Sequence, residues 1–218
     1  MKKTLIILPL SKFIIPFIIG IGTFGTIGLM VSEQLRGIYW SLISMYFLPP
    51  LGKESVIPTG IALGFHPILI ALSIAFVDIV VALFLVWNYE LAIKIPLIGR
   101  FMKKVEQIGQ VSSGKYSWIK PLRFIGIMLF VMVPFQGSGG LVGTILGRMI
   151  GMKPWNVFIG ICVGAISGSL LVAYFADMIK SVFIKNMLMG MFIVILLIII
   201  GIMIWVYRIM SKKRRNEQ

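Results

Sequence analysis

Charge is scarce in this sequence, and negative charge is the scarcest. Only 13% of the 218 residues are charged, and 7 Asp and Glu residues face 21 Lys and Arg residues. Soluble domains are about 25% charged. The hydrophobic share is 59% and the mean hydropathy is +1.02. This composition leaves no room for a separate soluble domain, and it predicts an integral membrane protein whose residues 1–218 form a single transmembrane domain.

Cysteine and histidine are nearly absent as well. Cys162 and His66 are the single representatives of their types. One cysteine excludes a disulfide within the chain, and the isolated histidine has no neighbours with metal-ligand spacing. Neither a Ser-His-Asp set nor a Cys-His set is present, so we expect neither enzymatic activity nor a cofactor. His66 directly precedes Pro67 and is expected at a helix end or a membrane interface.

The formal net charge of +14 does not predict nucleic-acid binding, because no nucleic-acid-binding motif accompanies it. The basic residues gather instead in connecting segments and tails, where topology and anionic lipid headgroups account for them. They lie at Lys2, Lys3 and Lys12, in a loop at 88–123 (Lys94, Arg100, Lys103, Lys104, Lys115, Lys120 and Arg123), and in the tail (Arg208, Lys212, Lys213, Arg214 and Arg215). The positive-inside rule therefore predicts that both termini and this loop are cytoplasmic, with residues 1–12 forming an anchor at the membrane surface.

Four apolar segments approach the length of about 20 residues that a helix needs to cross the hydrocarbon. They are 13–31, 67–87, 155–176 and 187–207. Two further apolar stretches, 38–65 and 124–151, are interrupted by Pro and Gly, and each side of each interruption is long enough for half a membrane. We therefore predict two re-entrant hairpins, since irregular backbone at membrane depth requires a protein-lined or cavity-lining environment.

The two broken stretches end in the same pattern, Gly-x-x-x-Gly-x-x-Pro. The first copy is Gly60, Gly64 and Pro67, and the second is Gly147, Gly151 and Pro154. With the basic loop and the basic tail on one side, the hairpins must enter from opposite faces, as in an inverted repeat. The predicted fold is an all-α polytopic protein with a first repeat at 1–88, the loop at 89–123, a second repeat at 124–207 and a tail at 208–218.

Three charged residues are candidates for a transport pathway, because ionisable groups at membrane depth usually face a cavity or a partner. Glu54 lies in the first break, where a low dielectric would ease its protonation; the alternative is a structural ion pair. Asp78 lies mid-helix, either as an ion or proton relay or as a structural partner of Lys53 or of a hairpin backbone. Arg148 either binds an anionic substrate or an acid, or extends to the interface.

Uncharged residues of the two breaks complete the candidate pathway. Unpaired backbone groups at such breaks can coordinate ions or phosphates, and the alternative is a plain turn. The members are Lys53 and Pro58 in the first break and Pro134, Gln136, Gly137, Ser138 and Gly139 in the second.

The segments GKESVIPTGIALG (52–64) and FVMVPFQGSGGLVGTILGRMIG (130–151) resemble the putative small multi-drug export protein family of archaea and bacteria. That family looks related to the DedA/VTT membrane proteins. The resemblance covers roughly 40–175 and implies opposed re-entrant hairpins, proton-dependent transport of lipid or lipid carriers, and a prokaryotic plasma membrane. By position, Glu54 matches the acidic hairpin residue of the family, and Arg148 looks like the DedA hairpin arginine.

The expected function is therefore secondary transport of a lipid, a lipid-phosphate or a small amphipathic molecule, coupled to protonation of Glu54 or Asp78. The expected partners are membrane lipids, this substrate and protons or another coupling ion, with homo-oligomerisation left open. The alternative is a membrane scaffold or lipid-organising protein without transport activity. A transporter would need Glu54, Asp78 and Arg148 individually, whereas a scaffold would tolerate neutral replacements there.

Overall fold

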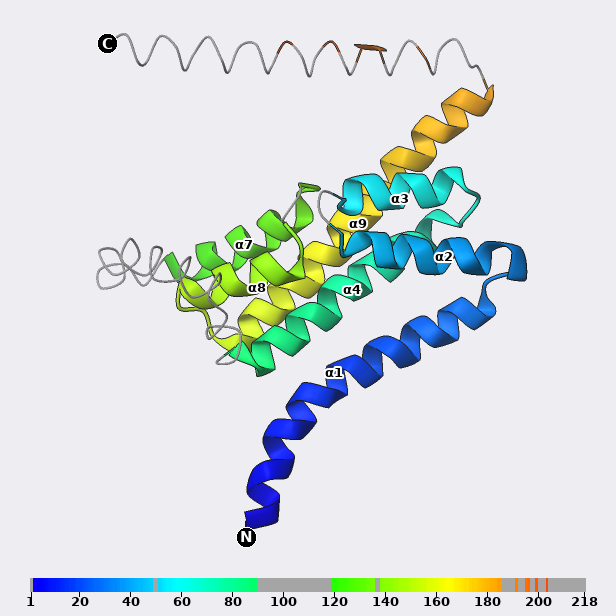
Figure 1. Cartoon of the computed structure of the whole chain (residues 1–218). Coiled ribbons are helices and arrows are strands. Elements are labelled where there is room, and N and C mark those ends of the chain that lie inside the picture. The colour runs from blue at the N-terminus through cyan, green and yellow to red at the C-terminus, as the bar shows by residue number, and fades with distance from the viewer. Residues whose placement is uncertain are drawn as a thin grey trace, which may run out of the picture. The chain divides into compact units, whose positions relative to one another are not determined.

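The computed structural model describes residues 2–48, 51–89, 119–135 and 138–185, together with single positions at 191, 195, 196, 199 and 203. All regular elements in these ranges are helices, which confirms the predicted all-α class. The chain divides into two compact units, Met1–Tyr174 and Phe175–Gln218. The helices are α1 (Lys2–Met30), α2 (Glu33–Tyr46), α3 (Lys53–Ala62), α4 (Pro67–Trp87), α7 (Ile119–Met132), α8 (Gly140–Met149) and α9 (Pro154–Lys185) (Figure 1).

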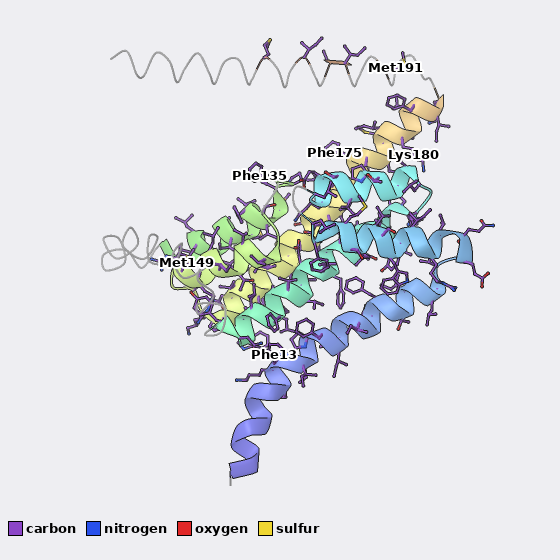
Figure 2. The ribbon with its side chains drawn as sticks, viewed as in Figure 1. Phe13, Phe135, Met149, Phe175, Lys180 and Met191 are labelled. Carbon is purple, nitrogen blue, oxygen red and sulfur yellow. The ribbon has the colours of Figure 1, made fainter. Side chains whose placement is uncertain are left out.

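Three of these helices are long and apolar enough to cross a membrane: Ser11–Met30 within α1, Pro67–Trp87, and Pro154–Lys185. They cover three of the four predicted spans, and the third helix continues past its predicted end at 176 to Lys185. The fourth, at 187–207, lies outside the described residues apart from single positions. Helix α1 starts at Lys2, so the predicted surface anchor at 1–12 continues directly into the first span. Phe13 of α1 packs on Phe84 of α4, with ring centroids 5.3 Å apart (Figure 2).

Each broken apolar stretch consists of two short helices. Helices α2 and α3 have 14 and 10 residues, and α7 and α8 also have 14 and 10. Gly52 and Gly139 are the extended residues that precede α3 and α8. The first break therefore ends at Gly52. Three residues that the sequence predicts in that break instead lie inside α3: Lys53 and Glu54 are its first two residues, and Pro58 is its sixth. The Pro58 ring removes one backbone N–H and leaves the Glu54 carbonyl without its helical donor, but α3 continues for four more residues.

The repeated Gly-x-x-x-Gly-x-x-Pro pattern forms the same turn in both places. Gly64 has φ = 102° and Gly151 has φ = 78°, a region that glycine enters without steric cost. Phe65 N donates to Gly60 O at 3.0 Å, and Met152 N donates to Gly147 O at 3.1 Å. These are the long closing bonds of a Schellman-type helix end. A proline then begins the next helix in each case.

The first glycine of each pattern lets the short helix fold back on the long helix that follows. A Cβ on Gly60 would lie 2.8 Å from Ile70, and a Cβ on Gly147 would lie 2.8 Å from Val157. Both contacted residues lie three positions after the proline. The glycine row of α9 works in the same way, because a Cβ on Gly164 or Gly168 would collide with backbone carbonyls of α7. Small residues at these positions therefore allow α9 to lie close against α7.

The two short-helix pairs lie along α4 from opposite ends (Figure 1). The α2–α3 pair lies near the start of α4, where Gly60 contacts Ile70. The α7–α8 pair lies near the end of α4, where Arg148 stacks over Tyr89 with 4.7 Å between the guanidinium carbon and the ring centroid. Tyr46, Lys53 and Gly140, which flank the two connections, contact Asp78 in the middle of α4. Between α7, α8 and α9 the buried core includes Val131, Val157, Ile161 and Ala165.

Candidate functional site

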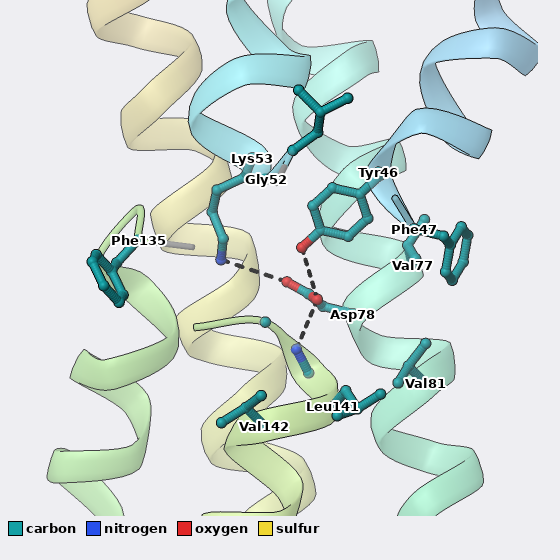
Figure 3. Close-up of a pocket in the computed structure, with 13 residues that line it drawn as sticks. Tyr46, Phe47, Gly52, Lys53, Val77, Asp78, Val81, Phe135, Leu141 and Val142 are labelled. Atoms are coloured by element: carbon teal, nitrogen blue, oxygen red, sulfur yellow. Dashed lines mark hydrogen bonds and ion pairs between the residues drawn. The ribbon is translucent and has the colours of Figure 1, made fainter. Parts of the chain in front are cut away.

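Asp78 is the central residue of the site. It is the twelfth residue of the 21-residue helix α4, and only 3% of its surface is exposed. Oδ1 accepts hydrogen bonds from the Tyr46 hydroxyl at 2.9 Å and from the Gly140 backbone N–H at 2.7 Å. Oδ2 lies 3.5 Å from Lys53 Nζ (Figure 3). One carboxylate therefore joins the end of α2, the start of α3 and the start of α8.

Lys53 is the first residue of α3 and is 2% exposed. A cation at a helix N-terminus is electrostatically unfavourable because the N-terminal end of the helix dipole is positive. Two contacts offset this: the ion pair with Asp78, and a 2.7 Å hydrogen bond from Nζ to Val131 O. Val131 lies in the last turn of α7, where the dipole is negative and carbonyls have no helical donor. The sequence-based alternative of Lys53 as the partner of Asp78 is the arrangement observed.

The start of α8 is capped by a residue from another helix. Gly139 precedes α8 and offers no side chain, so Asp78 supplies the acceptor for the first N–H, that of Gly140. Carboxylates near helix N-termini are favourable for the same dipole reason. A Cβ on Gly140 would collide with the Asp78 backbone carbonyl, and a Cβ on Gly139 would lie 2.8 Å from Asp78 Oδ1. The cap therefore requires glycine at these positions.

A cavity of about 230 Å³ adjoins the ion pair. Residues that flank both breaks line it together, with aromatic rings from each break and the polar groups of the Asp78 site (Figure 3). Pro58 is not part of the lining. The lining residues are Tyr46, Phe47, Leu51, Gly52, Lys53, Val77, Asp78, Val81, Phe135, Gly139, Gly140, Leu141 and Val142.

Glu54 lies beside this site without joining its hydrogen-bond network. Its carboxylate lies against Gly52, and its Oε2 is buried with no hydrogen-bond partner. The neighbouring Lys53 turns toward Asp78 instead. Glu54 is thus a half-buried acid that forms no ion pair with a described cation.

Arg148 lies away from both acids. It is eight residues after Gly140 on α8, which corresponds to about 12 Å along the helix. Its Nη1 donates to Met152 O at 3.0 Å, and its Nε is buried without a partner. The predicted pairing of Arg148 with Glu54 or Asp78 is therefore not observed in the structure. Glycines on either side of Arg148 serve the turn and the packing on Val157 rather than an approach to the acids.

The second break contributes backbone rather than side chains. Ser138 is buried, and its hydroxyl lies 2.7 Å from both Val133 O and Phe135 O, so its one hydrogen bonds a carbonyl of its own loop. This side chain therefore shapes the turn. Pro134 is exposed, while Gln136 and Gly137 lie outside the described residues. In the ranges that the structure describes, no three His, Cys, Asp or Glu side chains come together as a metal site would require.

Two members of the site were missed by the sequence analysis. Tyr46 is the last residue of α2, and its hydroxyl reaches Asp78. A tyrosine one turn before a Pro-Pro break is a usable signal, since a buried hydroxyl needs a partner. The Val131 carbonyl gives no signal, because any residue carries one.

These features define a polytopic helical membrane protein with a polar site enclosed among apolar helices. Residues 54–171, more than half of the chain, match the family model described as putative small multi-drug export protein, and the chain belongs to this family. Membership in this family, together with the apolar helices, indicates a membrane transporter, and an export family is not a class of enzymes. The family resemblance stated from the sequence is thereby confirmed. No curated protein and no solved structure matches the chain.

Proposed function

We propose that this protein is a proton-coupled secondary transporter whose two short-helix pairs are opposed re-entrant hairpins of an inverted repeat. The equal helix lengths, the repeated turn and the meeting of both breaks at Asp78 support this arrangement. Half-helices that end at a buried polar site are the usual construction of transporter binding sites. The basic loop and tail support a prokaryotic plasma membrane with both termini in the cytoplasm.

A single buried ion pair that joins both hairpins carries the proposal. Lys53 belongs to the first hairpin and also bonds to Val131 of the second, while Asp78 bonds to groups of both. In this state the pair closes the connection between the hairpins. Any path through the centre of the protein requires these contacts to separate, and separation is costly while both groups stay charged and unpaired.

Glu54 is the group that we assign to the coupling proton. It lies next to Lys53 in sequence and has a buried oxygen without a donor. Ionisable groups at membrane depth commonly mark ion pathways and proton relays. A negatively charged Glu54 competes with Asp78 for Lys53, whereas a neutral Glu54 leaves Lys53 to Asp78. Protonation of Glu54 thereby favours the closed state.

The substrate class follows from the lining of the cavity. Its walls are aliphatic and aromatic, with polar groups at one side, which suits a lipid, a lipid-phosphate or another small amphipathic molecule. The volume of about 230 Å³ is below the range of roughly 300–1,000 Å³ typical of sites that enclose a drug-sized ligand. We therefore assign the structure to a closed state that widens when the ion pair separates.

Transport by reconstituted protein tests this proposal. Vesicles with an imposed pH gradient are given ethidium, an amphipathic cation, or phosphatidylglycerol with a fluorescent label, and movement across the bilayer is measured. Wild-type protein is expected to move at least one probe faster than empty vesicles, and Asp78→Asn is expected to abolish that difference. If neither probe moves, or if Asp78→Asn transports as well as wild type, the protein is better described as a scaffold or lipid-organising protein.

A further inference from the structure

Basic side chains gather at the end of the bundle where α4 and α8 finish and α7 and α9 begin. Arg123 Nη1 donates to Ile150 O at 2.9 Å, and Arg148 Nη1 donates to Met152 O at 3.0 Å. The two guanidinium groups thus bind carbonyls two residues apart in the turn between α8 and α9. Lys153, the next residue, is exposed. The three cations therefore surround one turn.

A fourth basic residue is tied to the same end. Asn88 follows α4, and its Nδ2 donates to the Lys12 carbonyl at 2.9 Å. Tyr89, the next residue, lies under the Arg148 guanidinium. Lys12 is therefore held beside the end of α4 by α1, close to the residues that contact Arg148.

Among the described residues, this positive cluster has no acidic counterpart. Over the part of the chain that the structure describes, no Asp or Glu forms an ion pair with Lys12, Arg123, Arg148 or Lys153. Arg148 Nε is buried and has no hydrogen-bond acceptor. A guanidinium that has a buried N–H without an acceptor leaves free energy to be gained from an anion, because charge-assisted hydrogen bonds are the strong ones.

The position of the cluster indicates where that anion comes from. Two helices long enough to span the bilayer, α4 and α9, end and begin there. Trp155, the second residue of α9, is 57% exposed, and Trp87 is the last residue of α4. Tryptophans at the ends of spans lie at the headgroup level of a bilayer.

We infer that Arg123, Arg148 and Lys153 form a binding site for the headgroup of an anionic phospholipid, with Trp155 beside its glycerol region. Basic pockets between the ends of membrane helices commonly hold such headgroups. The site lies at the opposite end of α8 from the Asp78 ion pair, so it is separate from the proposed transport pathway. A bound lipid bridges α7, α8 and α9 and stabilises the turn at 150–152.

The chain offers a matched control at the other end of the bundle. Arg36 Nε donates to Gly28 O at 3.1 Å, so it too is an arginine bound to a backbone carbonyl at a helix end. Arg36 differs from Arg123 and Arg148 because the basic residues of the cluster do not surround it. Loss of lipid binding in an Arg36 variant would therefore report a general effect of charge or folding.

The test measures the melting temperature of purified protein in detergent as phosphatidylglycerol or phosphatidylcholine is titrated in. Wild-type protein is expected to be stabilised by phosphatidylglycerol and much less by phosphatidylcholine. The double variant Arg123→Gln/Arg148→Gln is expected to bind phosphatidylglycerol about 30-fold more weakly, since each cation near an anionic surface contributes about 1 kcal/mol. Arg123→Lys/Arg148→Lys should retain most of the preference, and Arg36→Gln all of it.

For each variant, the rise in melting temperature with phosphatidylglycerol is compared with the rise with phosphatidylcholine. A variant that is less stable overall would therefore not produce a false loss of lipid preference. Equal stabilisation of wild-type protein by both lipids would overturn the inference. So would an equal loss of preference in Arg36→Gln. Inorganic phosphate is titrated as a third probe, and stabilisation by phosphate alone equal to that by the lipid would assign the cluster to a free anion instead.

Discussion

Removing either partner of the buried ion pair should destabilise the protein far more than removing both. Lys53 Nζ and Asp78 Oδ2 are 3.5 Å apart, and the side chains of the two residues are 2% and 4% exposed. At an effective dielectric constant of about 20, two unit charges at this distance attract by about 5 kcal/mol. Desolvation opposes this attraction, so the pair itself contributes little, but an unpaired buried charge costs roughly 3–5 kcal/mol.

The substitutions can be chosen so that the ion pair alone is lost. In Asp78→Asn the amide oxygen still accepts from Tyr46 and from Gly140, and in Lys53→Met the aliphatic part of the side chain is kept. Each single variant is therefore expected to lose about 3–5 kcal/mol of unfolding free energy. In the double variant no charge remains unpaired, so we expect its loss to be smaller than that of either single variant.

Equilibrium unfolding in mixed micelles, with increasing denaturing detergent, measures these free energies. The difference between the double variant and the sum of the single variants is the coupling energy, and we expect at least about 2 kcal/mol. Asp177→Asn, which removes an exposed carboxylate, serves as the control and should change stability by less than about 0.5 kcal/mol. Additive losses, with the double variant the least stable, would refute the reasoning.

Three further changes have defined outcomes. Gly140→Ala should cost about 1–3 kcal/mol of unfolding free energy because the new Cβ collides with backbone, whereas Gly25→Ala, which meets nothing within 4 Å, should be neutral by the same measurement. Tyr46→Phe should cost about 1.5–3 kcal/mol because it removes a hydrogen bond to a charged group; the coupling energy of the ion pair, measured in this background, should persist. Ser113→Cys in a Cys162→Ala chain should resist an impermeant thiol reagent added to intact cells, since the basic loop is predicted to be cytoplasmic; labelling from outside would contradict the two-hairpin topology.

Hydropathy and helix-breaking residues suffice to predict much of the fold. Three spans, two interrupted stretches and the repeated turn can each be read locally, because span length, proline and glycine act within one element. The same local view misplaced Lys53, Glu54 and Pro58, since a proline inside a short helix and a proline in a loop look alike in sequence. The end of the first break is set instead by Gly52, whose extended conformation precedes α3.

The site was only partly predictable. Asp78 is conspicuous because it is the one charge in a long apolar segment, and Lys53 followed as a candidate partner. Which cation pairs with which acid depends on how distant helices pack. Arg148 was therefore expected near the acids, although the register of α8 directs it to Tyr89 and Met152. The roles of Tyr46 and the Val131 carbonyl likewise arise only where α2 and α7 meet α3 and α4.

The coupling role of Glu54 is the central claim, and the pH dependence of transport by Glu54→Gln tests it most directly. The initial rate of probe movement is measured in reconstituted vesicles at a series of internal pH values, for wild type, Glu54→Gln and Glu54→Asp, each normalised to folded protein. Glutamine imitates the protonated acid, so Glu54→Gln should fold and should lose transport driven by a pH gradient, while Glu54→Asp should keep part of it with a shifted pH profile. A Glu54→Gln variant with the wild-type rate and the wild-type pH profile would contradict the account.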